Sequence, residues 1–465
     1  MDGQHIPLGI SQQKFSKNIQ AVTSRTLDLP PSCIEFVPRE KAPVELDPSS
    51  HYFVIGTYNL EKNDQTAART AAESEGNDMI AVPPAPQERN GTLNLFSIRA
   101  DKSLILVERL SYPSAILDLH FIPGEPIFAV ASSTGAISIY TFSLVPQTVE
   151  IKPGNIGLKA WEWGIRHIKM HQVFATNVLV LSFIWLSYST TADAPPLLAA
   201  TTSAGEIYMI SFSDWDFTGF QILNDELPIN THDAEAWCCA FCPSTHCLYS
   251  GGDDSWLRVI DLNLAALQEP ESTDDLIGQA NTIRGHDAGV TAILPLPYRQ
   301  QRMFLTGSYD DHIRLYSWQN SSGCPLPKPR EMTKLNLGGG VWKLKFLEDR
   351  PMRDGPGGHV KFRVLASCMH IGAKIVEVSL VGGGEWRMDV AAEVNVHESM
   401  CYGCDVLPLR SGVKAGDEVV EPEAKSQGKE GAMTVEVDGE EKRNSLKPPS
   451  SPGPGSWGGK LSPKF

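Results

Sequence analysis

Short runs in which apolar and polar residues alternate recur along the whole chain, each bounded by Gly, Pro, Asp or Asn. Clear cases are Ile116–Phe121, Ile137–Tyr140 and Ile313–Trp318. A period of two indicates β-strands that bury one face, rather than helices. The runs form groups of similar order that recur about every forty residues, and such units cannot bury their faces alone. The pattern therefore predicts antiparallel units that close into a ring.

Two of the groups carry a more specific motif. Gly285–Val290 is followed by Leu305–Trp318, which gives a Gly-His turn, an apolar strand, a small-residue strand with a turn Asp, and a final alternating strand. This order is typical of a WD-type repeat. The spacing predicts structural polar pairs, because a buried polar set is tolerated only when each member has a partner. The expected pairs are His286 with Asp310 and His232 with Asp254.

Weaker copies of the same order extend the ring on both sides. An initial unit comprises Cys33–Val37, His51–Tyr58 and Thr92–Ile98, and the last recognisable unit opens at Val396–Pro408 without the later strands of a repeat. Ring closure in propellers commonly uses an N-terminal strand, for which Ala21–Leu29 is the candidate. The sequence predicts an all-β, seven-bladed WD-type β-propeller with six full blades and a partial seventh.

Composition changes mark the limits of this ring. Residues 1–20 are expected to be a flexible N-terminal segment, and the propeller is expected to span residues 21–408. Residues 61–90 are polar and are predicted to be a disordered insertion between two strands of the first unit. Residues 409–465 are rich in Lys, Glu, Gly, Pro and Ser and are predicted to be a disordered tail, with one weak strand candidate at Met433–Val437.

Charge and cysteine content narrow the class of function. The net charge of -15 argues against a nucleic-acid partner, which requires a basic face. No apolar run is long enough for a membrane-spanning helix, and no targeting segment is visible, so a cytoplasmic monomer is expected. The nine cysteines include the pairs Cys239/Cys242 and Cys401/Cys404. Both pairs fall in expected strands, where residues three apart face opposite ways, so no metal site is predicted.

The entry loops and turns of the units are expected to meet on one face of the ring. That face receives aromatic and titratable residues, namely Asp233, Glu235, Trp237, Asp253, Tyr309, Asp311, Trp342, His370, His397 and Tyr402. The chain lacks a Gly-x-Ser-x-Gly nucleophile elbow, a His-Glu-x-x-His zinc motif and a phosphate-binding glycine loop. Any catalytic set must therefore be assembled from separate blades.

Four stretches give the chain a family resemblance. They are Ile55–Tyr58, His232–Trp237, Gly338–Leu344 and His397–Asp405, and their order within a run of WD-like units is more specific than any one of them. The chain resembles the diphthine methylesterases, WD-repeat proteins of the diphthamide pathway, in a fungal-type form. The likeness covers about Arg25 to Pro408 and ends where the family continues with a further strand and turn.

The resemblance implies a carboxyl-methylesterase that removes the methyl ester from methylated diphthine, a modified histidine of translation elongation factor 2, giving diphthine and methanol. It implies a protein substrate and no cofactor. The substrate carries a trimethylammonium group, which aromatic faces and carboxylates bind well. The candidate substrate-binding residues are Trp237, Trp342, Tyr309 and Asp311, and the candidate catalytic residues are His397, Tyr402, Asp233 and Glu235.

Other interpretations stay open at this stage. Trp237 and Trp342 could simply fill the centre of the ring, and His397 could be a free base or a solvated histidine beside an unfinished blade. The whole ring could be a non-catalytic scaffold that docks a protein partner, because fold alone does not fix function. A substrate adaptor for a ubiquitin ligase is a third possibility that rests on the fold only.

Overall fold

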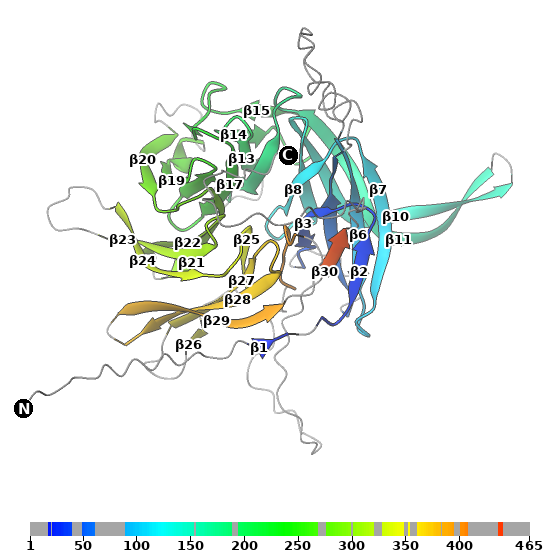
Figure 1. The fold of residues 1–465 in the computed structure, drawn as a ribbon. Helices are drawn as coiled ribbons and strands as arrows, with labels where there is room; N and C mark the ends of the chain where they lie inside the picture. Colours follow the sequence, from blue (N-terminus) through cyan, green and yellow to red (C-terminus); the bar gives the residue numbers. More distant parts are fainter. Residues whose placement is uncertain are drawn as a thin grey trace, which may run out of the picture.

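The computed structural model describes residues 17–19, 21–39, 49–60, 89–152, 155–187, 194–267, 276–298, 301–319, 328–347, 352–353, 360–382, 384–394, 400–407 and 436–439. Within these ranges the chain forms β-strands and one short 3-10 helix, η2 (Leu264–Leu267). Six sheets contain four or more strands each. Figure 1 shows them around a common centre, with one edge strand of each sheet toward that centre. The β-propeller predicted from the sequence is confirmed.

The first three blades follow one another along the chain, each with its strands in order from the centre of the ring outward. Blade 1 contains β3 (Pro31–Phe36), β4 (His51–Thr57), β6 (Arg89–Ile98) and β7 (Leu104–Tyr112), with β5 (Asn59–Leu60) paired to the start of β6. Blade 2 contains β8 (Ile116–Phe121), β9 (Ile127–Ser132), β10 (Ala136–Lys152) and β11 (Asn155–Gln172). Blade 3 contains β12 (Val180–Trp185), β13 (Leu197–Thr202) and β14 (Glu206–Phe212), and both β15 (Phe220–Ile222) and β16 (Asn230–Thr231) pair with β14.

The remaining three blades repeat the arrangement. Blade 4 contains β17 (Ala236–Cys242), β18 (Cys247–Gly252), β19 (Trp256–Leu262) and β20 (Ile277–Arg284). Blade 5 contains β21 (Val290–Tyr298), β22 (Gln301–Ser308), β23 (His312–Gln319) and β24 (Lys328–Asn336). Blade 6 contains β25 (Lys343–Phe346), β27 (Val360–Ser367), β28 (Ala373–Val381) and β29 (Glu385–Val394), with β26 (Met352–Arg353) paired to β27.

Burial follows the position of each strand in its blade. All residues of β13 and β18 are buried, because neighbouring blades cover both faces of these second strands. In β20, an outermost strand, exposed residues alternate with half-buried ones. Continuous apolar runs in the sequence therefore come mainly from the second strands, which neighbouring blades cover on both faces.

Blade 2 contains a feature that the repeat pattern did not predict. Its two outer strands, β10 and β11, pair along nearly their whole lengths and form a hairpin that projects beyond the ring in Figure 1. The motif of a repeat ends early in β10, so the sequence predicts only Ile137–Tyr140 as the third strand of this unit. The additional length is a hairpin that pairs with itself outside the ring and so leaves no trace in the repeat spacing.

The chain ends differ from the expected boundaries. β1 (Lys17–Asn18), predicted to lie in a flexible N-terminal segment, pairs in parallel with β29. β2 (Ser24–Leu27) falls within the expected closing strand and pairs in parallel with β30 (Glu436–Gly439), which overlaps the weak strand candidate of the tail. The rest of the tail and residues 61–88 of the insertion lie outside the described residues. Arg89 and Asn90, assigned to that insertion, belong to β6.

The segment Cys401–Leu407 lies between blade 6 and blade 1. The Cys401 amide donates to Met369 O at 3.0 Å, and the Phe36 amide donates to Asp405 Oδ2 at 2.7 Å. Gly403 has no side chain to accommodate at this point, because a Cβ would lie 3.2 Å from the Ile34 nitrogen. The segment makes one isolated bridge, Met369 to Cys401, rather than the regular innermost strand expected for a seventh blade. The segment contacts β3 through the Asp405 side chain, and the described residues show no backbone ladder between the two.

The polar pairs expected from the motif spacing are present as hydrogen bonds. His286 Nδ1 lies 3.2 Å from Asp310 Oδ2, and His286 Nε2 lies 2.7 Å from Thr306 Oγ1. In blade 4, His232 Nδ1 lies 3.0 Å from Asp254 Oδ1. Both histidines are buried, so these contacts fix the entry loop of each blade against its hairpin turn.

No helix among the described residues is long and apolar enough to cross a membrane.

We expect His286→Ala to lower the stability of the ring. The substitution leaves the Thr306 hydroxyl without its partner and removes one partner of Asp310, which costs on the order of 1–3 kcal/mol. Thermal unfolding measures the loss, and His370→Ala, on an exposed turn, is the matched control. An unchanged midpoint for His286→Ala alongside a loss of activity would assign His286 a functional role instead.

Candidate functional site

The same irregularity interrupts the innermost strand of five consecutive blades. In β3, β8, β12, β17 and β21 the pairing with the second strand skips one residue near the start of the strand. The skipped residues are Ser32, Leu117, Leu181, Trp237 and Thr291. A β-bulge of this kind leaves one residue unpaired and redirects its side chain. In blade 6, Trp342 occupies the equivalent place just before Lys343, the first paired residue of β25.

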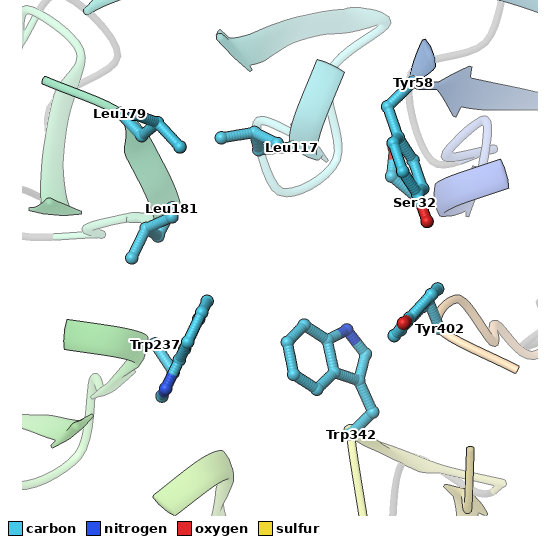
Figure 2. Close-up of a pocket in the computed structure, with 8 residues that line it drawn as sticks. All are labelled: Ser32, Tyr58, Leu117, Leu179, Leu181, Trp237, Trp342 and Tyr402. Atoms are coloured by element: carbon cyan, nitrogen blue, oxygen red, sulfur yellow. The ribbon is translucent and has the colours of Figure 1, made fainter. Parts of the chain in front are cut away.

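The bulges build a pocket at the mouth of the central channel. Its lining includes four of the bulge residues, and it encloses about 470 Å³, part of it open to solvent. Figure 2 shows the side chains around an open centre, with three leucines on one side and the aromatic rings on the others. The lining residues are Ser32, Tyr58, Leu117, Leu179, Leu181, Trp237, Trp342 and Tyr402.

One wall of the pocket is a continuous aromatic cluster. The ring centroids of Trp237 and Trp342 are 5.7 Å apart, and those of Trp342 and Tyr402 are 5.3 Å apart. Tyr309 stands behind this wall, with centroids 5.8 Å from Trp342 and 6.3 Å from Trp237. Contacts at these distances hold the rings in fixed orientations. The faces of such rings attract cations, so the wall is suited to a cationic ligand.

Carboxylates lie close to the aromatic wall. The Trp237 indole donates to Asp253 Oδ1 at 3.2 Å. Burial, and then the charges of Asp253 and Glu235, raise the pKa of Tyr309, which therefore stays a neutral phenol. These two carboxylates add negative potential beside the rings, which strengthens the preference for a cation.

A network of charged side chains fills the channel one residue deeper along the inner strands. Asp118 Oδ1 pairs with Lys343 Nζ at 3.1 Å, and Asp118 Oδ2 accepts a hydrogen bond from Ser182 Oγ at 2.7 Å. Asp118 belongs to blade 2 and Lys343 to blade 6, so this ion pair crosses the channel past blade 1. His120 Nε2 lies 3.3 Å from Asp118 Oδ2.

The second half of the network lies two residues further along the same strands. His120 Nδ1 contacts Glu35 Oε2 at 2.6 Å, and Lys345 Nζ lies 3.8 Å from that oxygen. Lys345 also lies 3.5 Å from Asp405 Oδ1. We call the six residues Glu35, Asp118, His120, Lys343, Lys345 and Asp405 the channel network. It contains three acidic and three basic side chains, so its charges can balance.

The channel network sets the protonation states of its members. Burial alone would lower the pKa of His120, but the charges of Asp118 and Glu35 outweigh burial and raise it to about 9. Burial disfavours ionisation of Asp118, yet Lys343 and His120 hold the pKa of that carboxyl well below its usual range. At neutral pH, His120 is a cation and Asp118 an anion.

The structure brings together most of the aromatic residues singled out in the sequence. Trp237, Trp342 and Tyr402 line the pocket, and Tyr309 packs behind them. Asp233 and Glu235 are exposed residues of the loop that enters β17, beside the pocket rather than among its lining. His397 lies outside the described residues.

Asp311 lies in a different setting from the one expected. It has a φ of 65° in the turn between β22 and β23, the position that Gly135 and Gly205 take in blades 2 and 3. Its carbonyl accepts a hydrogen bond from the Leu337 amide at 2.8 Å. The residue shapes a hairpin turn and does not line the pocket.

Apart from Trp237, the bulge residues were not predicted from the sequence, nor was the channel network. The sequence did contain a signal. Asp118 and His120 occupy every second position of one otherwise apolar run, and Lys343 and Lys345 do the same in another. Buried charges of this kind need partners and are often functional. Among the described residues, no group of His, Cys, Asp and Glu side chains has the arrangement of a metal site.

Comparison with protein families identifies part of the ring. The model of the WD domain, G-beta repeat, matches residues 226–261 and 278–317. These ranges cover most of blades 4 and 5, which carry the two clearest motifs. The other blades have the same strand order without the full motif.

Three proteins from other organisms are similar over most of the chain, and each is named diphthine methyltransferase. The human protein is 25% identical over 76% of this chain and 69% of its own length. The mouse protein is 27% identical over 76% of this chain and 64% of its own length. The protein from Schizosaccharomyces pombe is 29% identical over 68% of this chain and 79% of its own length.

These similarities confirm the resemblance seen in the sequence. The chain is similar along most of its length to proteins that are named for diphthine. Their name differs from the expectation in one respect, since it describes a methyltransferase where the resemblance implies a methylesterase.

We expect the free energy of unfolding of the ring to decrease at alkaline pH, as His120 loses its proton. Its pKa is raised from 6.5 to about 9 in the folded protein, so its contribution is complete below about pH 6.5 and is lost as the pH rises through about 9. The contribution is about 3 kcal/mol, at about 1.36 kcal/mol for each unit of the rise in pKa. Chemical unfolding from pH 6 to pH 10 measures it.

His120→Gln should flatten this alkaline dependence, whereas His370→Gln, at an exposed position, should retain it. An alkaline dependence that is the same in His120→Gln and in the wild type contradicts the assignment.

Proposed function

We propose that this protein acts on a methylated diphthine residue of translation elongation factor 2 and hydrolyses its methyl ester. The aromatic pocket carries the proposal. Diphthine bears a quaternary trimethylammonium group, which cannot accept or donate a conventional hydrogen bond and is held by ring faces. Trp237, Trp342 and Tyr402 offer such faces at the open mouth of the channel.

The electrostatics of the pocket support the same substrate class. Asp253 and Glu235 place negative charge beside the rings, and the net charge of the chain is -15. The pocket is open on one side, so a side chain that projects from the surface of a large protein can enter it while the rest of that protein stays outside. The similarity to proteins named for diphthine supports this choice among cationic ligands.

The proposed reaction is hydrolysis of a carboxylic ester. A water oxygen forms a bond to the ester carbonyl carbon, the bond from that carbon to the methoxy oxygen breaks, and the methoxy group leaves as methanol after gaining a proton. The products are a carboxylate, a proton and methanol. The step needs a base for the water and a donor for the developing oxyanion. Tyr402, Asp233, Glu235 and His397 remain the proposed candidates from the sequence for proton transfer.

A methyltransferase, the activity named for the relatives, would change the substrate in the opposite direction. Transfer of a methyl group adds mass and requires a methyl donor, whereas hydrolysis removes mass and requires only water. The resemblance to methylesterases favours hydrolysis, and the direction of the mass change separates the two.

Incubation of the protein with elongation factor 2 that bears methylated diphthine should remove one methylene equivalent from the modified peptide and release methanol. Mass spectrometry of that peptide measures the change, with the same factor lacking the modification as control. A gain of one methylene equivalent that depends on a methyl donor would establish the transferase instead. No mass change under either condition would favour the docking scaffold.

Trp237→Ala should raise the KM for this substrate with little effect on the melting temperature. The indole forms pocket wall, and the loss of a cation–aromatic contact costs about 1–2 kcal/mol, roughly a tenfold weakening. Steady-state kinetics measure it. The matched control is Trp256→Ala, since Trp256 stacks against Arg284 in blade 4 and lies outside the pocket. Equal KM values for the two variants would remove the pocket from the proposal.

A further inference from the structure

Two charged residues directly follow pocket-wall residues along the chain. Lys343 follows Trp342, and Asp118 follows Leu117, whose side chain projects from a bulge. A bulge breaks the strict alternation of a strand, so that successive side chains can approach the same space. Lys343 and Asp118 each stand one residue along the strand from a pocket-lining residue, and neither side chain is itself part of that lining.

The two members of this pair differ in how fully they are engaged. Asp118 is 1% exposed and interacts with Lys343, Ser182 and His120. The side chain of Lys343 is 24% exposed, although it stands on an innermost strand, and its ammonium group contacts one carboxylate oxygen. An ammonium group carries three donors, so Lys343 retains capacity for a further acceptor.

The ion pair with Asp118 keeps Lys343 charged, so the ammonium retains all of its donors. Burial opposes the charge on Lys343, but Asp118 overcomes this and raises the pKa of the ammonium above its usual value. The pair connects β8 of blade 2 with β25 of blade 6, so it lies in the channel between the innermost strands. A fixed cation there, one residue along the chain from Trp342 of the cation-binding wall, forms a site that can bind a cationic group and an anionic group together.

We infer that Lys343 binds the carboxyl group of a ligand whose trimethylammonium group lies against Trp237, Trp342 and Tyr402. The ligand class is a betaine, in which a quaternary ammonium and a carboxyl group share one carbon. The inference rests on the proposed function, because diphthine carries that arrangement. Lys343 donates to the ester carbonyl oxygen, and the interaction strengthens when that oxygen becomes an oxyanion or the product becomes a carboxylate.

The remaining cation of β25 does not share this role. Lys345 lies two residues deeper and already contacts two carboxylates, Glu35 and Asp405. Its pKa is raised because the charges of Asp405 and Glu35 outweigh burial. Its position and partners make it part of the seam between blades 1 and 6.

Binding of two small probes tests the inference. Glycine betaine carries both groups, and tetramethylammonium carries only the cation. Titration calorimetry of the full chain should give tighter binding of glycine betaine, by about tenfold to a hundredfold, as expected for one charge-assisted hydrogen bond. In Lys343→Met the two probes should bind with equal affinity, and in Lys343→Arg the preference for glycine betaine should return in part.

Two further variants control for damage to the fold. Lys361→Met removes an ion pair of similar length, 3.0 Å to Glu377, in the same blade and should keep the preference. The double variant Asp118→Asn with Lys343→Met removes both charges, avoids an unpaired buried carboxylate and should likewise bind the two probes with equal affinity. Thermal unfolding of each variant establishes that the ring is intact.

The outcomes separate this inference from the function on which it rests. Equal binding of the two probes by the wild type, or a preference that survives Lys343→Met, overturns the role of Lys343. The same result with a wild type that demethylates elongation factor 2 leaves the proposed function standing. Loss of the preference for glycine betaine in Lys343→Met, with tetramethylammonium binding retained, supports the inference even if the modified factor proves not to be the substrate.

Discussion

The cross-channel ion pair between Asp118 and Lys343 is the interaction on which the rest of the structure depends. It joins blade 2 to blade 6, whose innermost strands belong to different sheets with no ladder between them. The segment Cys401–Leu407 lies between blades 6 and 1, where it contributes one β-bridge and the side chain of Asp405. Where backbone pairing is sparse, charge pairing across the axis supplies the connection.

Burying so many charges is costly, and two facts make it tolerable in this ring. Three acids and three bases share the channel, and the acids also receive donors from Ser182 and from the amides of Phe36 and Phe121. A buried network is stable when each member has partners, and removal of one member leaves the others uncompensated. The six residues therefore act as a unit that connects the innermost strands of blades 1, 2 and 6.

Much of the ring could be predicted from the sequence, because its signal is local. Local sequence patterns predicted the bounds of β8 and β13 to the residue. The spacing of His286, Thr306 and Asp310 predicted the hydrogen bonds among them. The aromatic wall could also be anticipated, since entry loops of successive units must meet on one face. Trp237 and Trp342 are distant in sequence, and the closure of the ring brings them to 5.7 Å.

The features that could not be predicted depend on distant parts of the chain. Asp118 and Lys343 are 225 residues apart, and their contact follows only from the order of blades around the axis. The bulges depend on pairing between strands, which alternation within one strand does not report. The place of Asp311 in a turn is another case, because its left-handed backbone is usual for Gly and gives no sign in an Asp.

The repeated bulge has a consequence for how such a ring can change over evolutionary time. Four blades each contribute one bulge side chain to the pocket, from a position that the ladder does not use. A substitution there alters the wall and leaves the strand pairing of that blade as it was. Ser32, Leu117, Leu181 and Trp237 are thus four nearly independent choices made on a constant frame. A ring of this design can therefore acquire specificity for a new ligand through substitutions in one blade at a time.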